Sequence, residues 1–356
     1  MQKKINRRLI LLMMILPVSA WTFASEPAGG KMNPKEIIFN HIQDAYWWHI
    51  TNRISIYLPV ILYSSTGGLH VFSSSRIDHG DRYKGFFIST EGKYAGKIVE
   101  LNSAGEEIRP VDLSLTKIAV AIIINSAIML ILFLSVARWY KRKPGHAVPG
   151  GLVGAVEMLV MSIEEEVIRK GAGKDYARYS PYLLTVFFFI FINNLMGLVP
   201  FFPGGANVTG NISVTLVLAV CTMLAINLSG NREYWKEIFW PDVPLWMKVP
   251  VPLMPVIELF GVLSKPFALT IRLFANITAG HAVILALTCL VFITVQMGAA
   301  IHTGMTLFSV LLSVFMSFLE ILVAYIQAYV FTMLSAVFIG LARREGHPGR
   351  KMGKTI

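Results

Sequence analysis

Two long runs with almost no charge constrain this chain more than any other feature. Residues 179–231 contain no Asp, Glu, Lys or Arg. Residues 249–342 carry only four formal charges, which are Glu258, Lys265, Arg272 and Glu320. Each run is longer than the roughly 20 apolar residues that a membrane-spanning helix needs. With a mean hydropathy of +0.59 and 15% charged residues, the chain is too apolar for an ordinary soluble domain. The sequence therefore predicts one polytopic membrane body.

The charge balance and the cysteines narrow the functional classes. The formal net charge is +11, and on a membrane protein such an excess indicates cytoplasmic anchoring loops rather than nucleic-acid binding. Cys221 and Cys289 each lie inside an apolar run. Neither a structural disulfide nor metal-ligand spacing is therefore expected, and nothing in the sequence indicates a cofactor.

The first residues have the pattern of a secretory signal peptide. A basic stretch over residues 3–8 precedes the apolar run Leu9–Val18, and Ala20 and Ala24 are small residues suited to cleavage. We expect a signal peptide over residues 1–24, with an uncleaved anchor helix as the alternative. Cleavage would place the new N-terminus outside the cytoplasm.

Residues 25–115 predict a small extracytoplasmic, β-rich extension. A short helix is expected over Pro34–His49. Turn signals such as Gly67-Gly68 separate the expected strands, which cover residues 54–63, 69–73, 86–90 and 97–101. The region contains no catalytic constellation.

The rest of the chain predicts an all-α membrane domain over residues 116–342. The expected spans cover residues 118–137, 182–199, 212–228, 256–297 and 305–341. The last two exceed the length of a perpendicular span, so tilted helices are expected. Residues 152–170 predict an amphipathic helix at the cytoplasmic interface. Basic residues follow the first span and fill the tail 343–356, which places both of those ends in the cytoplasm.

Arg272 is the strongest candidate for a functional residue. Guanidinium effectively never loses its proton, and placing it at membrane depth costs roughly 2.5–3.5 kcal/mol on insertion scales. At 100° per residue, one helical stripe carries Arg272, Asn276, Lys265 and Glu258, whereas His281 lies on the opposite side. Glu320 and Gln327 are seven residues apart and share a face of the last helix. Such stripes need water or a polar partner.

Structural roles compete with functional ones at most of these positions. Lys265 is expected to snorkel to the interface, and Glu258 could pair with it. Asn276 and Gln327 could join helices through hydrogen bonds, and His281 and Glu320 could form a structural pair. Arg272 has no acidic residue within one turn of its own helix. Its acidic partner is therefore expected to be Glu320 or a residue of another subunit.

At these residues the sequence resembles a known family. The segments PVIELFGVLSKPFALTIRLFANITAGH (Pro255–His281), LEILVAYIQAYVFTML (Leu319–Leu334) and PYLLTVFFFIFINNLMGLVP (Pro181–Pro200) are similar to subunit a of the F-type ATP synthase. The resemblance covers about Leu113–Arg343. Ala275 and Ala268 depart from the pattern, because the family often has glycine and a hydroxyl residue there. The N-terminal extension resembles the exported segment of some bacterial members.

The resemblance implies a non-catalytic proton-channel subunit of the bacterial inner membrane. Its partners would be the c-subunit ring, the subunit b peripheral stalk, the rest of the ATP synthase and membrane lipid. Arg272 matches the arginine that faces the ring carboxylate and separates two half-channels. The remaining matched half-channel positions are Glu258, Asn276, His281, Glu320 and Gln327. A secondary transporter and a structural scaffold are the alternatives, and the choice between H⁺ and Na⁺ belongs largely to the ring.

Overall fold

A computed structural model describes residues 44–51, 54–64, 67–89, 92–102, 105–142, 148–199, 203–240 and 253–343. The expected signal peptide, most of the expected helix at Pro34–His49 and nearly all of the basic tail lie outside these residues. The chain divides into two compact units. The first comprises Met1–Ala127, Leu195–Val208 and Gly280–Glu320, and the second comprises Ile128–Asn194, Thr209–Ala279 and Ile321–Ile356. Each is described by itself.

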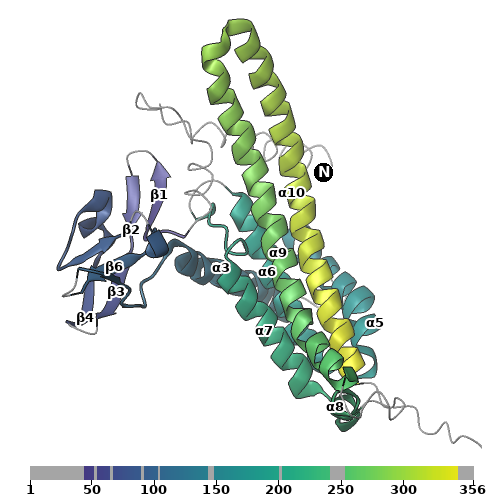
Figure 1. Cartoon of the computed structure of the whole chain (residues 1–356). Helices are drawn as coiled ribbons and strands as arrows, with labels where there is room; N and C mark the ends of the chain where they lie inside the picture. The colour runs from purple at the N-terminus through teal and green to yellow at the C-terminus, as the bar shows by residue number, and fades with distance from the viewer. Residues whose placement is uncertain are drawn as a thin grey trace, which may run out of the picture. The chain divides into compact units, whose positions relative to one another are not determined.

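The first unit contains a set of short antiparallel strands (Figure 1). They are β1 (Trp47–Thr51), β2 (Ile54–Tyr57), β3 (Pro59–Ser64), β4 (Gly68–Ser73), β5 (Phe86–Ile88), β6 (Ile98–Leu101), β7 (Glu107–Ile108) and β8 (Val111–Asp112). β1 pairs with β2, while β4-β3-β8 and β5-β6-β7 form two three-stranded sheets. This confirms the β-rich segment. The expected helix was wrong at Trp47–His49, which belongs to β1, and the expected strand over residues 54–63 is broken at Leu58.

One apolar cluster stabilises these strands. Its buried members are Tyr46, Val60, Leu62, Phe72, Ile77, Phe86 and Ile98. Alternate residues of a strand point to opposite faces, so Val60 and Leu62 on β3 enter this core together. Tyr46 also donates a hydrogen bond from its hydroxyl to Asp112 Oδ2, at 2.5 Å. Burial, followed by this hydrogen bond, raises the pKa of the Tyr46 hydroxyl.

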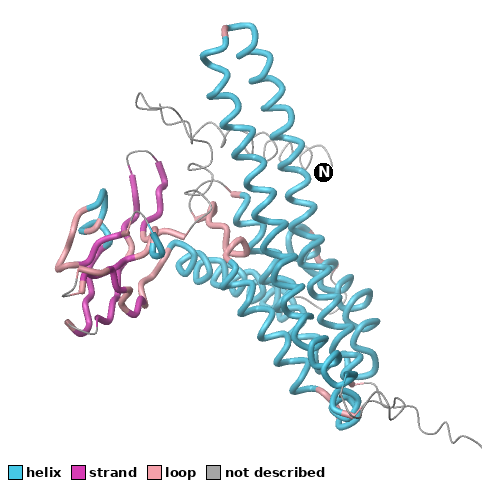
Figure 2. Tube along the Cα trace, in the orientation of Figure 1, coloured by secondary structure: helices cyan, strands magenta, loops and turns pink. Residues whose placement is uncertain are grey.

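From Lys117 onward the described chain is mostly helical (Figure 2). They are α3 (Lys117–Arg142), α4 (Gly151–Ser162), α5 (Arg169–Ala172), α6 (Tyr176–Leu198), α7 (Ile212–Ser229), α8 (Arg232–Phe239), α9 (Leu253–Thr294) and α10 (Ala299–Ala342). Within the described ranges, five helical stretches are long and apolar enough to cross a membrane. They begin at or near residues 117, 151, 212, 254 and 299, which confirms the expected multi-pass helical architecture.

The expected amphipathic helix over residues 152–170 takes an irregular form. Its middle, Ile163–Ile168, is a π-helix between α4 and α5, which is a rare geometry in proteins. Ile163, Val167 and Ile168 are buried there, while Glu164 Oε1 accepts a hydrogen bond from Ser180 Oγ of α6 at 3.1 Å. The helix ends where Gly173 adopts a φ of 71°, a conformation that favours glycine.

The connection between the last two helices is shorter than expected. The expected spans over residues 256–297 and 305–341 leave a connection over Gly298–Gly304. The structure instead turns at Gly298, whose φ is 99°, and α10 already begins at Ala299. A single glycine in this conformation is enough to end one helix before the next begins. The α9–α10 hairpin therefore has almost no loop.

The second unit is built around an apolar core contributed by several helices. Leu183, Phe187 and Ile190 of α6 are fully buried in it, together with Leu273 of α9 and Ile339 of α10. Gly340 of α10 lies against the backbone of Gly171, where a Cβ would overlap the carbonyl oxygen. This close approach fixes the end of α10 beside α5, the last part of the helical stretch that precedes α6.

Candidate functional site

Arg272 lies in the middle of α9 with its side chain exposed at the surface of the chain. Its neighbours Leu269 and Leu273 are only 3% and 1% exposed. Arg272 therefore lies at the edge of the α9 face that packs into the core. Among the residues that the structure describes, none forms a hydrogen bond or an ion pair with Arg272. The positive charge of Arg272, in a helix long and apolar enough to cross a membrane, thus has no counter-ion from the described part of its own chain.

The other polar residues of this α9 stripe also lack the partners that we considered. Glu258 and Lys265 are half-buried and form no ion pair with each other or with any other described residue. The Lys265 ammonium instead lies 5.0 Å from the centre of the Phe338 ring. Asn276 is exposed. The pairing of Glu258 with Lys265 that the sequence allowed is therefore not formed.

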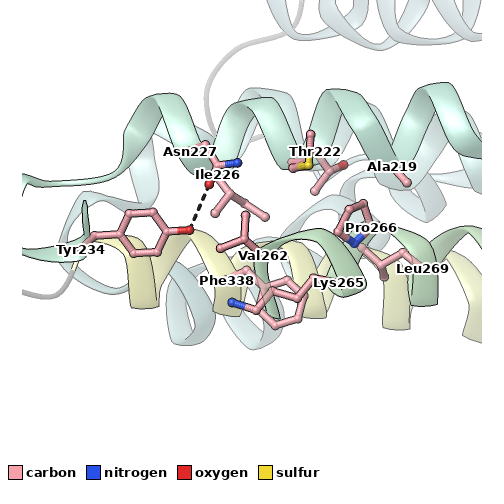
Figure 3. Close-up of a pocket in the computed structure, with 11 residues that line it drawn as sticks. Ala219, Thr222, Ile226, Asn227, Tyr234, Val262, Lys265, Pro266, Leu269 and Phe338 are labelled. Atoms are coloured by element: carbon pink, nitrogen blue, oxygen red, sulfur yellow. Dashed lines mark hydrogen bonds between the residues drawn. The ribbon is translucent and has the colours of Figure 1, made fainter. Parts of the chain in front are cut away.

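Lys265 borders a pocket lined by α7, α8, α9 and α10 (Figure 3). The lining residues are Ala219, Thr222, Met223, Ile226, Asn227, Tyr234, Val262, Lys265, Pro266, Leu269 and Phe338. Tyr234 donates a hydrogen bond from its hydroxyl to Asn227 Oδ1 at 3.0 Å. Burial, followed by the negative charge of Glu258, raises the pKa of Tyr234. Most of the wall is aliphatic or aromatic, so we assign it no ligand.

Glu320 is buried at the contact between α9 and α10. A Cβ placed on Gly280 would lie 2.6 Å from Glu320 Oε1 and 3.3 Å from its Cγ and Cδ. The absence of a side chain at Gly280 therefore makes the space that this carboxyl group occupies. Glu320 is 8% exposed, and no hydrogen bond or ion pair joins it to another described residue. A buried polar group of this kind needs a hydrogen bond from water or from another chain.

His281 follows Gly280 and lies beside the end of α6. Its Nε2 atom is 3.7 Å from the position that a Cβ on Gly197 would occupy. The carbonyl oxygen of Ala206 is equally close to that position. His281 thus directly follows Gly280, the α9 residue against which the Glu320 carboxyl group of α10 lies.

From the sequence alone, no role was assigned to Asn194. Its buried side-chain amide lies next to the face of α10 that carries Glu320 and Gln327, which we call the α10 stripe. Thr209 Oγ1 donates to Asn194 Oδ1 at 2.6 Å, and Asn194 Nδ2 donates to the backbone oxygen of Ala324 at 3.4 Å. Ala324 lies one turn from both Glu320 and Gln327 on the same helical face, and Gln327 is itself only 7% exposed. The adjacent residues Asn193 and Asn194, in an otherwise apolar span, were the sequence signal that could have indicated this site.

Comparisons with known proteins divide the chain at the start of α3. Residues 119–340 match the family described as ATP synthase A chain, and residues 37–114 match one described as Domain of unknown function (DUF8433). ATP synthase subunit a 2 of Prosthecochloris aestuarii is 44% identical over 245 residues, which cover 67% of this chain and 72% of that protein. ATP synthase subunit a of Pelodictyon phaeoclathratiforme is 44% identical over 253 residues, covering 69% and 71%. The Myxococcus xanthus subunit a is 40% identical over 244 residues, covering 66% and 75%.

Proposed function

The chain belongs to the ATP synthase A chain family, and from that premise we propose that Arg272 is the fixed cation that the carboxylates of a rotating c-subunit ring meet and leave. Family membership and five span-length helices make the chain a multi-pass membrane subunit of the F-type ATP synthase and part of its proton-channel machinery. Such a subunit has no catalytic site for ATP. The proposal concerns how this subunit handles the proton.

The observation that carries the proposal is the unneutralised guanidinium of Arg272. It is exposed on a span-length helix and has no acidic partner in the described chain. A carboxylate carried through lipid is favoured in its neutral form, because loss of hydration raises its pKa, whereas a neighbouring arginine favours the ionised form. Each ring carboxylate would therefore release its proton on reaching Arg272. Because arginine does not exchange its own proton, it also blocks direct leakage.

Two half-channels, opening to opposite sides, would connect this cation to water. We assign Asn276, His281, Glu320, Gln327 and Glu258 to them. The burial of Glu320 and Gln327 supports this assignment, since both need hydrogen-bonding partners that the described residues do not supply. Histidine and a carboxyl group are suitable relay groups near neutral pH. A water-bridged relay between His281 and Glu320 fits their adjacent positions.

The same proposal sets the topology and the partners. The signal peptide over residues 1–24 would export the extension over residues 25–115, and the membrane domain over residues 116–342 would end in a cytoplasmic tail. The protein would lie in a bacterial inner membrane, against the c-subunit ring and the subunit b peripheral stalk. The basic residues in the last turn of α3, Lys141 and Arg142, support this orientation.

Substitution of Arg272 tests the proposed role. We expect Arg272→Lys and Arg272→Ala to assemble into the complex and to abolish ATP synthesis driven by a proton gradient in membrane vesicles. Lys265→Ala, which removes the other cation of α9, is the matched control and should retain most of the synthesis. Normal synthesis by Arg272→Lys would refute the role and favour a structural scaffold.

A further inference from the structure

One face of the β4-β3-β8 sheet is apolar and exposed. Residues paired across antiparallel strands lie on the same side of a sheet. Tyr63 of β3 is opposite Leu69 of β4 and Val111 of β8, and Ile61 is opposite Val71. The amide of Leu113 continues this row by donating to the Ile61 carbonyl. We call these six residues the outer sheet face: Ile61, Tyr63, Leu69, Val71, Val111 and Leu113.

The exposure of the outer sheet face is high for such residues. Tyr63 is 55% exposed, Leu69 64%, Val71 63%, Val111 60% and Leu113 65%. The opposite face of β3 carries Val60 and Leu62, which are completely buried in the strand core. Contiguous apolar patches of this kind on a folded surface mark contact with a partner or a membrane.

The alternation along residues 111–115 is the reverse of that in a water-facing strand. Asp112 points inward and accepts the Tyr46 hydroxyl hydrogen bond. Ser114 Oγ accepts a hydrogen bond from the Ile61 amide at 3.1 Å, while Val111 and Leu113 point outward. Antiparallel strands with one face in water place polar residues outside. Apolar-out and polar-in alternation is typical of strands that face lipid.

A short and hydrogen-bonded link holds this sheet close to the membrane. Residues 113–116 alone separate β8 from α3, which begins the first span-length helix. Even fully extended, the step from Asp112 to Lys117 covers at most about 18 Å. The link is also fixed, because the Leu115 amide donates to the Pro59 carbonyl at 3.2 Å and the Lys117 amide to the Ala45 carbonyl at 2.8 Å. The outer sheet face therefore lies near the lipid headgroups where α3 enters.

We propose that the outer sheet face rests on the membrane surface beside α3, with its side chains among the lipid headgroups and the first acyl carbons. Tyrosine favours this depth, which suits Tyr63. None of the six residues is charged, so the contact would be made with phospholipid in general rather than with anionic headgroups. The extension over residues 44–112 would thus be a membrane-lying platform. This inference does not depend on the role of Arg272.

Spin labels on the full-length chain test the proposal. With Cys221 and Cys289 replaced by alanine, a nitroxide is attached at Val71→Cys, and at Ser75→Cys as the matched control. Ser75 is exposed on the turn that directly follows β4, outside the outer sheet face. The chain is reconstituted in phosphatidylcholine vesicles. We expect oxygen, which concentrates in lipid, to relax the label at position 71 more than a water-soluble nickel chelate does, and the opposite at position 75.

Two results would overturn the lipid contact. Equal nickel accessibility at both positions in vesicles would place the outer sheet face in water. A label at position 71 that is open to nickel in the isolated chain, but shielded from both reagents in the assembled ATP synthase, would identify a protein partner instead. Leu69→Cys offers a second position on the face if Val71→Cys fails to insert.

Discussion

Adding one methyl group at Gly280 should disturb the proposed relay at a known atom. The Cβ of Gly280→Ala would lie 2.6 Å from Glu320 Oε1, whereas ordinary contact begins at 3.4 Å. The carboxyl oxygen must therefore withdraw by about 0.8 Å. Because the Glu320 side chain can rotate, we expect the helices to stay packed and the carboxyl group to move. Misplacing a reacting group by about 1 Å can cost up to about 100-fold in rate, so we expect proton flux to fall on the order of tenfold or more.

The assay is passive and ATP-driven proton flux in vesicles that contain the assembled complex. Gly304→Ala is the matched control, because Gly304 lies on α10 and a Cβ there meets nothing within 4 Å. Both substitutions exchange the same residues in a long apolar helix. If Gly280→Ala and Gly304→Ala show equal flux, the position of the Glu320 carboxyl group does not matter for proton transfer, and its assignment to a half-channel is wrong.

Two further predictions concern pairs of residues. His281→Ala and Glu320→Ala should each slow proton flux. The loss in the double variant should be smaller than the sum of the two single losses, because members of one relay are coupled. Fully additive losses would mean that the two residues act separately. In the extension, Tyr46→Phe should lower the stability of the strands by about 1.5–3 kcal/mol, the usual range for a hydrogen bond to a charged group, as measured by hydrogen exchange of the β3 amides. The folded-state pKa of Tyr46 is raised, so its stabilisation is complete below the unfolded value of about 10 and is lost as the pH rises above it. Tyr46→Phe should show a smaller alkaline loss than the native chain.

Much of the helical architecture could be predicted because charge and length decide it. Long apolar runs with few or no charges predicted the positions of α3, α6, α7, α9 and α10, since each unpaired charge in lipid is costly. The end of the helical stretch expected over residues 152–170 was also predictable, because Gly173 can adopt a positive φ at little cost.

Local geometry that depends on tertiary contacts could not be read in the same way. Trp47–Thr51 forms a strand because it pairs with β2. No alternation of apolar and polar residues in the sequence predicted that pairing. The π-helical turn at Ile163–Ile168 keeps its apolar residues facing one core, which only the packing reveals. The turn at Gly298 is tight because α10 begins at Ala299, the next residue. The sequence did not show that the helix starts so early.

The residues of the candidate site also differ in whether the sequence alone could identify them. Arg272 stood out in the sequence because a charge in an apolar run has few structural explanations. Asn194 did not, because a buried asparagine usually joins helices, and only its bonds to Thr209 and Ala324 place it beside the α10 stripe. The space at Gly280 was also not visible, since a helical glycine reveals nothing of its neighbours until they are placed.

A structure of the assembled ATP synthase in its membrane would test the central claim most directly. The decisive quantity is the distance from the Arg272 guanidinium nitrogens to the nearest carboxylate oxygen on any chain. We predict a carboxylate of a ring subunit within about 4 Å, the range of a direct ion pair, in at least one rotary position and a longer separation in others. A guanidinium bound in every position to an acid of its own chain, or directed into lipid with no ring beside it, would contradict the account.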